Sequence, residues 1–285
     1  MKILKFLMTV SLLPVAIALS AREPEGKNPD QLRVVCYNIR SDIDGKFTDG
    51  DNSWCYRMDA SFEMIKDMKP DVFGMQEARP HQLYDMEENL PKYRRIGVGR
   101  DDGRQKGEHA AIMFNKQTIK VMEWGTYWLS ETPDIPSKGW DASYPRTATW
   151  ARMRHLPSGK EFFIVNTHLD HRGKLAQMNG LALIRERVAK MNPDGIPMIL
   201  MGDFNVFSDN PCIVELDKEM TSARTSAIDS DTKGSYNGWG TAERVIDYIY
   251  YSGFSQCPVF KVIDKTYAKV PYISDHYPLF TILQF

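Results

Sequence analysis

The chain has 285 residues, a hydrophobic content of 42% and a formal net charge of −1 at pH 7. This length and composition can bury a sizeable core and fit one large domain or two small ones. The near-neutral balance, in which the longest run of basic residues is Arg94-Arg95, argues against stable binding of duplex DNA through its phosphates. A small or flexible anionic partner fits this composition better.

Residues 1–20 have the pattern of an export signal. Lys2 and Lys5 come before or within an apolar run that reaches Leu19, and small residues around Ser20 offer a cleavage site. The run is short for a membrane span, so we expect no transmembrane segment. We predict a signal peptide over 1–20, a short linker over 21–31, and an exported protein that is periplasmic or extracellular after cleavage.

The first part of the mature chain has a strand-helix-strand pattern. A β-branched apolar run predicts a strand over 32–39, and helical spacing before Pro70 predicts a helix over 56–69. A second buried strand is expected over 71–77. Both strands end in polar residues, Asn38 and Glu77, which indicates an α/β layout with a site at one sheet edge.

The middle of the chain predicts more strands. We expect a helix over 81–90 and strands over 93–99 and 110–114, with a charged loop at 100–109. Strands and turns continue through 119–155, where four tryptophans are better explained by packing than by a ligand platform.

A strand over 161–169 runs into His168, Asp170 and His171, and a helix follows over 174–191. Asp170 and His171 are equally compatible with lining a pocket and with capping this helix.

The segment 196–206 combines a buried apolar strand with two polar residues at its end. Asp203 and Asn205 are two positions apart and point the same way on an extended backbone. A carboxylate beside an amide can hold a metal-bound water and accept its proton. A plain turn after a core strand is the alternative.

The last third supplies three more polar groups. After a short helix opened by Pro211, residues 221–240 lack periodicity and predict a loop over the site. Asp247 lies inside an apolar strand expected over 244–251, and Asp275-His276 precede the closing strand over 279–283. The sequence has no repeat and no interdomain linker, so we predict a single domain over 32–285 that is a monomer.

The cysteines leave the redox state open. In an exported protein these four residues allow three pairings, although a cysteine in a buried strand is as well explained by a free thiol. They are Cys36, Cys55, Cys212 and Cys257.

The polar strand ends form an ordered set of short motifs: Asn38, Gln76-Glu77, Asn166-Thr-His168, Gly202-Asp-Phe-Asn205, Ile246-Asp-Tyr248 and Ser274-Asp-His276. In this order and spacing they resemble the endonuclease/exonuclease/phosphatase superfamily, over essentially the whole mature chain. Exported bacterial members look most similar. The resemblance implies a deoxyribonuclease I-like α/β (α+β) fold, a four-layered α/β/β/α sandwich of two packed mixed β-sheets flanked by helices. It also implies a divalent metal, usually Mg²⁺, and in-line hydrolysis of a phosphate ester.

The resemblance also implies roles for individual residues. Glu77 would be the principal ligand of Mg²⁺ or Mn²⁺, assisted by Asn38 and Asp275. Asp247 would orient His276, and this pair and Asp203 are alternative candidates for activating water.

Two further residues would act on the substrate and the water. Asn205 would orient the water or the phosphate, and His168 would bond a phosphoryl oxygen.

Two arginines complete the expected site. Arg146 lies where family members place a phosphate-contacting Tyr or Arg. Arg40 stands where nuclease members often carry an acid, so this chain departs from the DNA-repair pattern and places a cation near the substrate phosphate.

The leading hypothesis from the sequence is therefore a secreted, divalent-metal-dependent phosphoesterase, foremost a phosphodiesterase or nuclease of single-stranded nucleic acid or nucleotides. The alternatives are a phosphatase of sugar or inositol phosphates and a phosphodiesterase of phospholipid headgroups. A glycan-binding sandwich without catalysis is the alternative from a different class.

Overall fold

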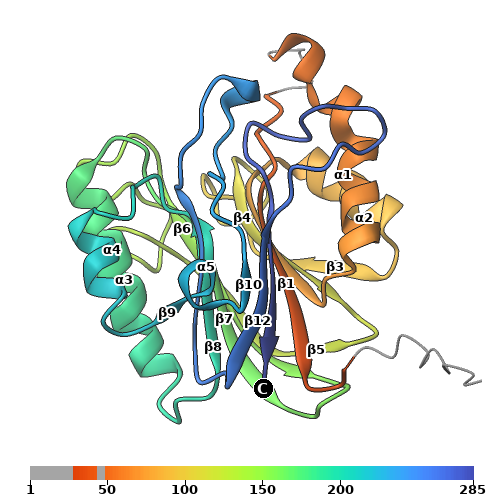
Figure 1. The fold of residues 1–285 in the computed structure, drawn as a ribbon. Helices are drawn as coiled ribbons and strands as arrows, with labels where there is room; N and C mark the ends of the chain where they lie inside the picture. The colour runs from red at the N-terminus through yellow and green to blue at the C-terminus, as the bar shows by residue number, and fades with distance from the viewer. Residues whose placement is uncertain (1–27, 44–48) are drawn as a thin grey trace, which may run out of the picture.

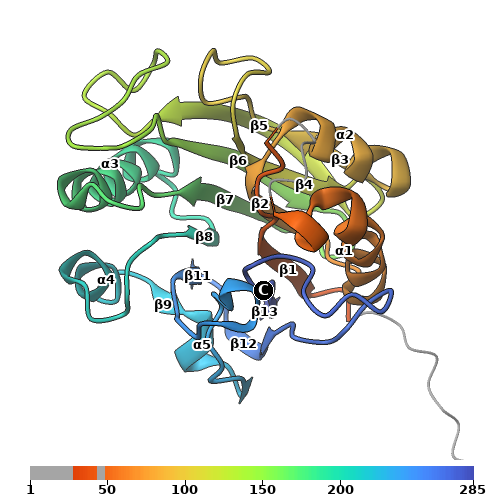
Figure 2. The same cartoon turned by 90° about the horizontal axis from the view of Figure 1, so that it is seen from above.

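A computed structural model describes residues 28–43 and 49–285. Two β-sheets pack face to face and carry helices on their outer faces, which gives four layers (Figures 1 and 2). The α/β/β/α sandwich expected from the sequence is confirmed. The predicted signal peptide and residues 21–27 of the predicted linker lie outside the described residues. No helix in the described part of the chain is both long and apolar enough to cross a bilayer.

The first sheet has seven strands in the order β10-β12-β13-β1-β2-β4-β3. Their bounds are β1 (Gln31–Asn38), β2 (Val72–Ala78), β3 (Tyr93–Ile96), β4 (His109–Asn115), β10 (Asp229–Ser230), β12 (Gln256–Val262) and β13 (Leu279–Gln284). β1 runs parallel to β2 and antiparallel to β13. The strand ends that carry Asn38 and Glu77 therefore meet at one edge.

The second sheet has six strands in the order β5-β6-β7-β8-β11-β9. Their bounds are β5 (Ile119–Trp128), β6 (Thr147–His155), β7 (Glu161–His168), β8 (Met198–Asp203), β9 (Thr221–Ser222) and β11 (Asp247–Ser252). β7 and β8 are parallel, and β8 and β11 are antiparallel.

Helices α1 (Trp54–Met68) and α2 (Pro80–Asn89) cover the first sheet, and α3 (Lys174–Met191) and α4 (Pro211–Leu216) cover the second (Figure 1). The short elements are α5 (Ala223–Ser226) and the 3₁₀ turns η1 (Gly50–Asn52) and η2 (Gly238–Gly240). α1 ends at Met68, and the left-handed φ of 49° at Lys69 terminates the helix before Pro70.

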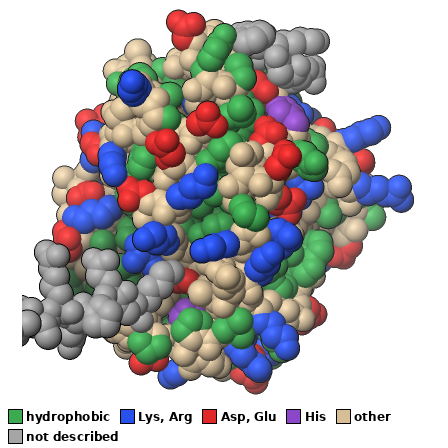
Figure 3. Space-filling view, turned by 90° about the vertical axis from the view of Figure 1, so that its right-hand side faces the viewer, with side chains coloured by type: hydrophobic (Ala, Val, Ile, Leu, Met, Phe, Trp, Pro, Cys, Tyr) green, Lys and Arg blue, Asp and Glu red, His purple; other side chains and the backbone are tan. Residues whose placement is uncertain are grey.

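Each sheet is buried on both faces, which explains the continuous apolar runs in the sequence. In β8, Ile199 and Met201 pack between the sheets, whereas Leu200 packs toward α3 with Leu181 and Ile184. Residues that alternate along one strand thus join two separate cores. The outer surface carries both signs of charge, as the face over α1 and α2 shows (Figure 3).

The structure corrects several sequence predictions. The segment 221–240 contains β9, α5, β10 and η2 rather than an irregular loop alone. β12 has no predicted counterpart, because Pro258 interrupts its pattern; the pairing of β12 with β13 shifts register between Gln256 and Val259. The helix expected over 174–191 is confirmed as α3, but its apolar residues do not all pack inward, since Leu175 and Met178 are exposed. All four cysteines are free thiols in the described chain, and Cys55 alone among them is exposed.

Candidate active site

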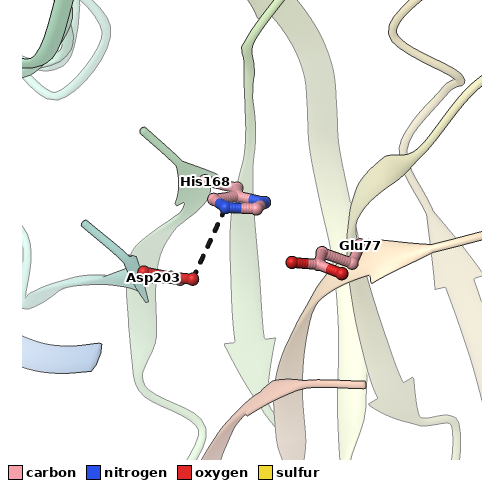
Figure 4. A group of neighbouring side chains, drawn as sticks. All are labelled: Glu77, His168 and Asp203. Atoms are coloured by element: carbon pink, nitrogen blue, oxygen red, sulfur yellow. Dashed lines mark ion pairs between the residues drawn. The ribbon is translucent and has the colours of Figure 1, made fainter. Parts of the chain in front are cut away.

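The ends of β2, β7 and β8 bring Glu77, His168 and Asp203 together (Figure 4). One ligand-type atom from each lies within 4.8 Å of the others. Asp247 and His276 form a second such group with the same Asp203. These five side chains come from distant parts of the sequence, and the packing of the two sheets makes them neighbours.

Strand register sets the spacing within this group. His168 pairs with Asp203 across the parallel β7–β8 ladder, and Asp247 pairs with Asp203 across β8–β11. Gly202 permits the close approach of β8 to β7: its φ is 153°, and a Cβ atom there would lie 1.9 Å from the Thr167 carbonyl oxygen.

The backbone is left-handed where three of these strands end. Arg40, Glu77 and Asn205 have φ values of 60°, 63° and 54°. Such conformations cost free energy for residues other than glycine and persist where surrounding contacts impose them, often at functional sites. In each case the side chain lines the cavity at this edge of the two sheets.

Asn166 ties the sheets together beneath this site. Its amide nitrogen donates to the carbonyls of Met75 (2.9 Å) and Ala111 (2.8 Å), and its side-chain oxygen accepts from Gln76 Nε2 at 2.6 Å. Gly74 leaves room for it, because a Cβ atom at that position would lie 2.6 Å from Asn166 Oδ1. The Asn166–Gln76 pair therefore fixes β7 relative to β2, and with it His168 relative to Glu77.

Asn38 links two of the acids. Its Nδ2 donates to Glu77 Oε1 (3.2 Å) and to Asp203 Oδ2 (3.0 Å). The backbone N–H of Ser41 donates to Glu77 Oε2 at 2.9 Å. Burial raises the pKa of Glu77, but the Ser41 N–H and the nearby Arg40 guanidinium outweigh it and hold the pKa below its usual value. Glu77 is therefore an anion at neutral pH.

Asp247 and His276 form a buried pair. Nδ1 of the His276 ring lies 2.8 Å from Asp247 Oδ2, and its Nε2 lies 3.8 Å from Asp203 Oδ2. Burial opposes the charged ring, but Asp247 and Asp203 more than compensate and raise the pKa of His276 to about 10. At neutral pH the ring is therefore an imidazolium and has no lone pair with which to accept a proton.

The pKa of Asp203, unlike that of His276, lies near neutral pH. Burial and the negative charge of Asp247 raise the pKa of Asp203 to about 7. Burial and Glu77 likewise raise the pKa of Asp275. Of the two candidates for accepting a proton from water, Asp203 thus has the pKa suited to neutral pH.

His168 is neutral. Burial and the cations Arg146 and Arg100 hold its pKa well below the usual value. Asn205 Nδ2 donates to the Leu169 carbonyl at 3.1 Å and lies 2.9 Å from His168 Nε2. Nε2 therefore accepts from this amide, which leaves the ring proton on Nδ1.

Arg40 and Asp275 form an ion pair in the wall of the cavity that these residues line. Arg40 makes a bidentate pair with Asp49, with both distances 2.9 Å, and its Nη1 lies 3.5 Å from Asp275 Oδ2. The Asp49 hydrogen bonds raise the pKa of Arg40 further. Arg40 therefore places a cation in the cavity wall, where it is shared with two carboxylates.

The structure separates the roles of Asp170 and His171. Asp170 lies behind the cavity wall with a side chain 0% exposed. It accepts from the backbone N–H groups of Arg172 (3.0 Å) and Gly173 (2.9 Å), just before α3, and lies 3.3 Å from Arg146 Nε. Asp170 is thus a turn residue that holds Arg146, and the prediction that it lines the pocket is wrong. His171 and Arg146 do line the cavity.

The cavity has a volume of about 580 Å³ and contains residues that the sequence did not single out. Those additional lining residues are Ser41, Ile43, Asp49, Arg79, Arg100, Glu108, Tyr144, Phe207, Tyr236 and Arg244. The many charged residues in 100–109 were a sequence signal for two of them, Arg100 and Glu108. The others come from loops whose course a single sequence does not indicate.

The donor set fits a hard divalent cation. Glu77, Asp203 and Asp275 supply carboxylate oxygens, and Asp247 Oδ1 is buried without a hydrogen-bond partner in the described chain. Oxygen ligands of this kind suit Mg²⁺ or Mn²⁺. A cation would also relieve the repulsion that raises the pKa of Asp203 and Asp275.

Arg57 supports the loops of the site from beneath. This α1 residue is 1% exposed. Its guanidinium donates to the carbonyls of Ile39, Arg40 (2.8 Å), Asn52 (2.8 Å) and Ile273 (3.1 Å). The carbonyls of Ile39, Arg40 and Ile273 belong to the segments that carry Asn38, Arg40 and Asp275, and that of Asn52 belongs to η1.

Replacing Arg57 with Met should destabilise the protein by about 3–5 kcal/mol, because buried carbonyls lose their donors. Urea unfolding would measure it. Lys66→Met, an exposed position on the same helix, is the control. Equal stability of both variants would contradict the importance given to this residue.

This arrangement of acids, histidines and amides at the edge of a two-sheet sandwich defines a hydrolase of phosphate esters. Residues 35–276 match the model of the Endonuclease/Exonuclease/phosphatase family, and the chain belongs to that family.

Three known proteins illustrate what the chain is similar to. A mannosyl-6-phosphatase of Bacteroides thetaiotaomicron is 35% identical, with a TM-score of 0.84 over 89% of this chain and 100% of that structure. An uncharacterized protein of Acanthamoeba polyphaga mimivirus is 26% identical over 81% of this chain and 92% of its own length. The human Nocturnin catalytic domain with bound sulfate is 18% identical over 90% of this chain and 94% of its own, with a TM-score of 0.71, a likeness of fold alone.

Proposed function

We propose that this chain is an exported, divalent-metal-dependent phosphoesterase that acts on a small phosphorylated molecule such as a sugar phosphate. The observation that carries the proposal is one cavity of about 580 Å³ that combines Glu77, His168 and Asp203 with five arginines. A volume in this range suits a small molecule rather than a polymer. The 35% identity to a mannosyl-6-phosphatase supports a sugar phosphate. Export rests on the pattern of residues 1–20.

Each residue of the site has a separate role in the proposed reaction. Glu77 would hold Mg²⁺ or Mn²⁺, with Asn38 and Asp275 beside it. The bound cation would polarise a phosphoryl oxygen and lower the pKa of a bound water. Asp203 accepts the proton of the attacking water.

The two histidines act on the phosphoryl group. The imidazolium of His276, held by Asp247, stabilises negative charge that develops there, and His168 donates from Nδ1 to a phosphoryl oxygen.

A nucleotide or single-stranded nucleic acid is the second candidate. Tyr144 lies at the cavity, is 51% exposed, and stacks on His171 with ring centroids 5.9 Å apart and an interplanar angle of 18°. Such a face can stack a base or the apolar side of a sugar ring. This exposed ring is the observation that supports nucleotides as the second candidate.

Phosphate release from hexose 6-phosphates, a nucleoside monophosphate and a short oligonucleotide tests the proposal. We expect turnover of a hexose phosphate with Mg²⁺ or Mn²⁺, loss to background in EDTA, and recovery when metal is restored. Cleavage that survives EDTA would contradict the metal dependence. A preference of about tenfold or more for the oligonucleotide, a difference of about 1.4 kcal/mol, would favour the second candidate.

A further inference from the structure

The loop between β3 and β4 holds Arg100 rigidly against the cavity. Arg100 N donates to the Glu108 carbonyl at 3.0 Å, and Gly99 N donates to the Arg104 carbonyl at 3.0 Å. The indole of Trp128 donates to the Arg100 carbonyl at 2.7 Å. The backbone of Arg100 is therefore fixed on both sides.

The Arg100 side chain is fixed as well. Its Nη1 lies 2.5 Å from Glu108 Oε2, and its guanidinium lies 5.0 Å from the centre of the Tyr144 ring. The residue is 9% exposed, and its Nε has no hydrogen-bond partner among the described residues; Asp101 Oδ1 lies 3.8 Å from it, beyond hydrogen-bond distance. A buried N–H of a charged group without an acceptor is costly.

Arg146 has the same incomplete pairing. Its Nε lies 3.3 Å from Asp170 Oδ2 and its Nη2 lies 3.2 Å from His171 Nδ1, while Nη1 is buried without a partner in the described part of the chain. Arg100 and Arg146 line one small recess together with His168 and the carboxylates of Glu77 and Glu108. Two buried guanidinium groups beside each other repel, and an anion between them would relieve that repulsion.

The size of the recess limits what can enter it. Its volume is about 10 Å³, which is room for one water-sized atom. An unesterified phosphoryl oxygen fits this space. An ester oxygen that carries a carbon chain does not.

We propose that Arg100, fixed by Glu108 and Tyr144, binds a terminal phosphoryl oxygen and makes the site prefer phosphomonoesters to phosphodiesters. This inference rests on the proposed phosphoesterase function. A monoester offers three unesterified oxygens and up to two negative charges. With one oxygen directed toward the cation that Glu77 would hold and one toward His168, the third enters the recess. A diester lacks this third oxygen and would place its second ester arm there.

Hydrolysis of p-nitrophenyl phosphate and bis(p-nitrophenyl) phosphate with Mg²⁺ tests the proposal in the wild type, Arg100→Gln and Arg100→Lys. Arg104→Gln, an exposed position on the same loop, is the matched control. We expect kcat/KM for the monoester to fall by about 10- to 100-fold in Arg100→Gln, because a charged hydrogen bond is lost. The kcat/KM for the diester should fall by less than about threefold. Arg100→Lys should retain part of the monoester activity because it keeps the charge, and should lose the rest because lysine lacks the planar guanidinium.

Inhibition gives a second readout that does not depend on turnover of either ester. The inhibition constant of orthophosphate should rise by about tenfold or more in Arg100→Gln, while that of dimethyl phosphate changes by less than about twofold. Thermal unfolding of each variant checks that the fold is kept.

A wild type that prefers the diester would overturn the proposal. So would equal losses on both esters in Arg100→Gln. In both cases the phosphoesterase function stands. A wild type that hydrolyses neither of these esters and none of the phosphate compounds above would remove the proposed function and this inference together.

Discussion

Glu77→Gln should lower kcat/KM by about 10³-fold or more and raise the Mg²⁺ concentration needed for half-maximal activity. The carboxylate is the anion at the end of β2, and the isosteric amide removes its charge while keeping its volume. A metal that stabilises transition-state charge contributes several kcal/mol, and about 4 kcal/mol corresponds to 10³-fold. Steady-state kinetics across a Mg²⁺ titration measure both quantities.

Glu88→Gln is the control for this variant, because Glu88 is an exposed carboxylate on α2, the next element along the chain. It should leave kcat/KM within about twofold of the wild type, as surface substitutions usually do. A Glu77→Gln protein that keeps a tenth or more of wild-type activity would rule out Glu77 as the principal metal ligand.

Asp203→Asn should lower kcat by about 10³-fold, because a carboxamide cannot take a proton from water and general-base catalysis contributes roughly 10²- to 10⁴-fold. The kinetics are measured at saturating substrate, beside Asp209→Asn as a control. Asp209 is an exposed acid that follows β8. If Asp203→Asn keeps its activity while His276→Ala loses it, then the Asp247–His276 pair rather than Asp203 activates the water.

Asp203 should also make the stability of the metal-free protein depend on pH. The carboxyl of Asp203 has an ordinary pKa of 3.8 and a folded pKa of about 7, and His276 has values of 6.5 and about 10. Each folded pKa is raised, so each stabilising contribution is complete below the ordinary pKa and is lost as pH rises through the folded one. In EDTA, Tm should fall by about 5 °C or more between pH 5.5 and 8.5.

Two changes should reduce this loss of Tm. Asp203→Asn removes one of the two titrating groups, so its Tm should fall less over the same interval. Mg²⁺ at pH 8.5 should raise the Tm of the wild type, since a cation stabilises the ionised carboxylates. A wild-type Tm that is constant or rises with pH in EDTA would contradict the assignment of the raised pKa values.

Most of the candidate site was accessible from sequence, because each residue follows or interrupts a strand whose apolar pattern is strong. Asn38, Glu77, His168 and Asp203 all occupy strand ends, where a polar group is costly unless it has a partner. Their order along the chain carried the family resemblance. Asp170 shows where such reasoning stops: it follows a strand in the same way, yet its carboxylate turns inward to Arg146 and to backbone N–H groups.

The sequence alone determined the strands, the main helices and the residues at the strand ends, since these depend on local periodicity and on short motifs. Tertiary structure alone decided which of those residues meet. The Asn166–Gln76 bridge sets the distance between the sheets, and Arg57 gathers carbonyls from three separate segments. Arg100 faces the cavity because its loop closes on itself and on Trp128. Such contacts join residues far apart in the chain, so their geometry arises from packing, which local sequence patterns do not encode.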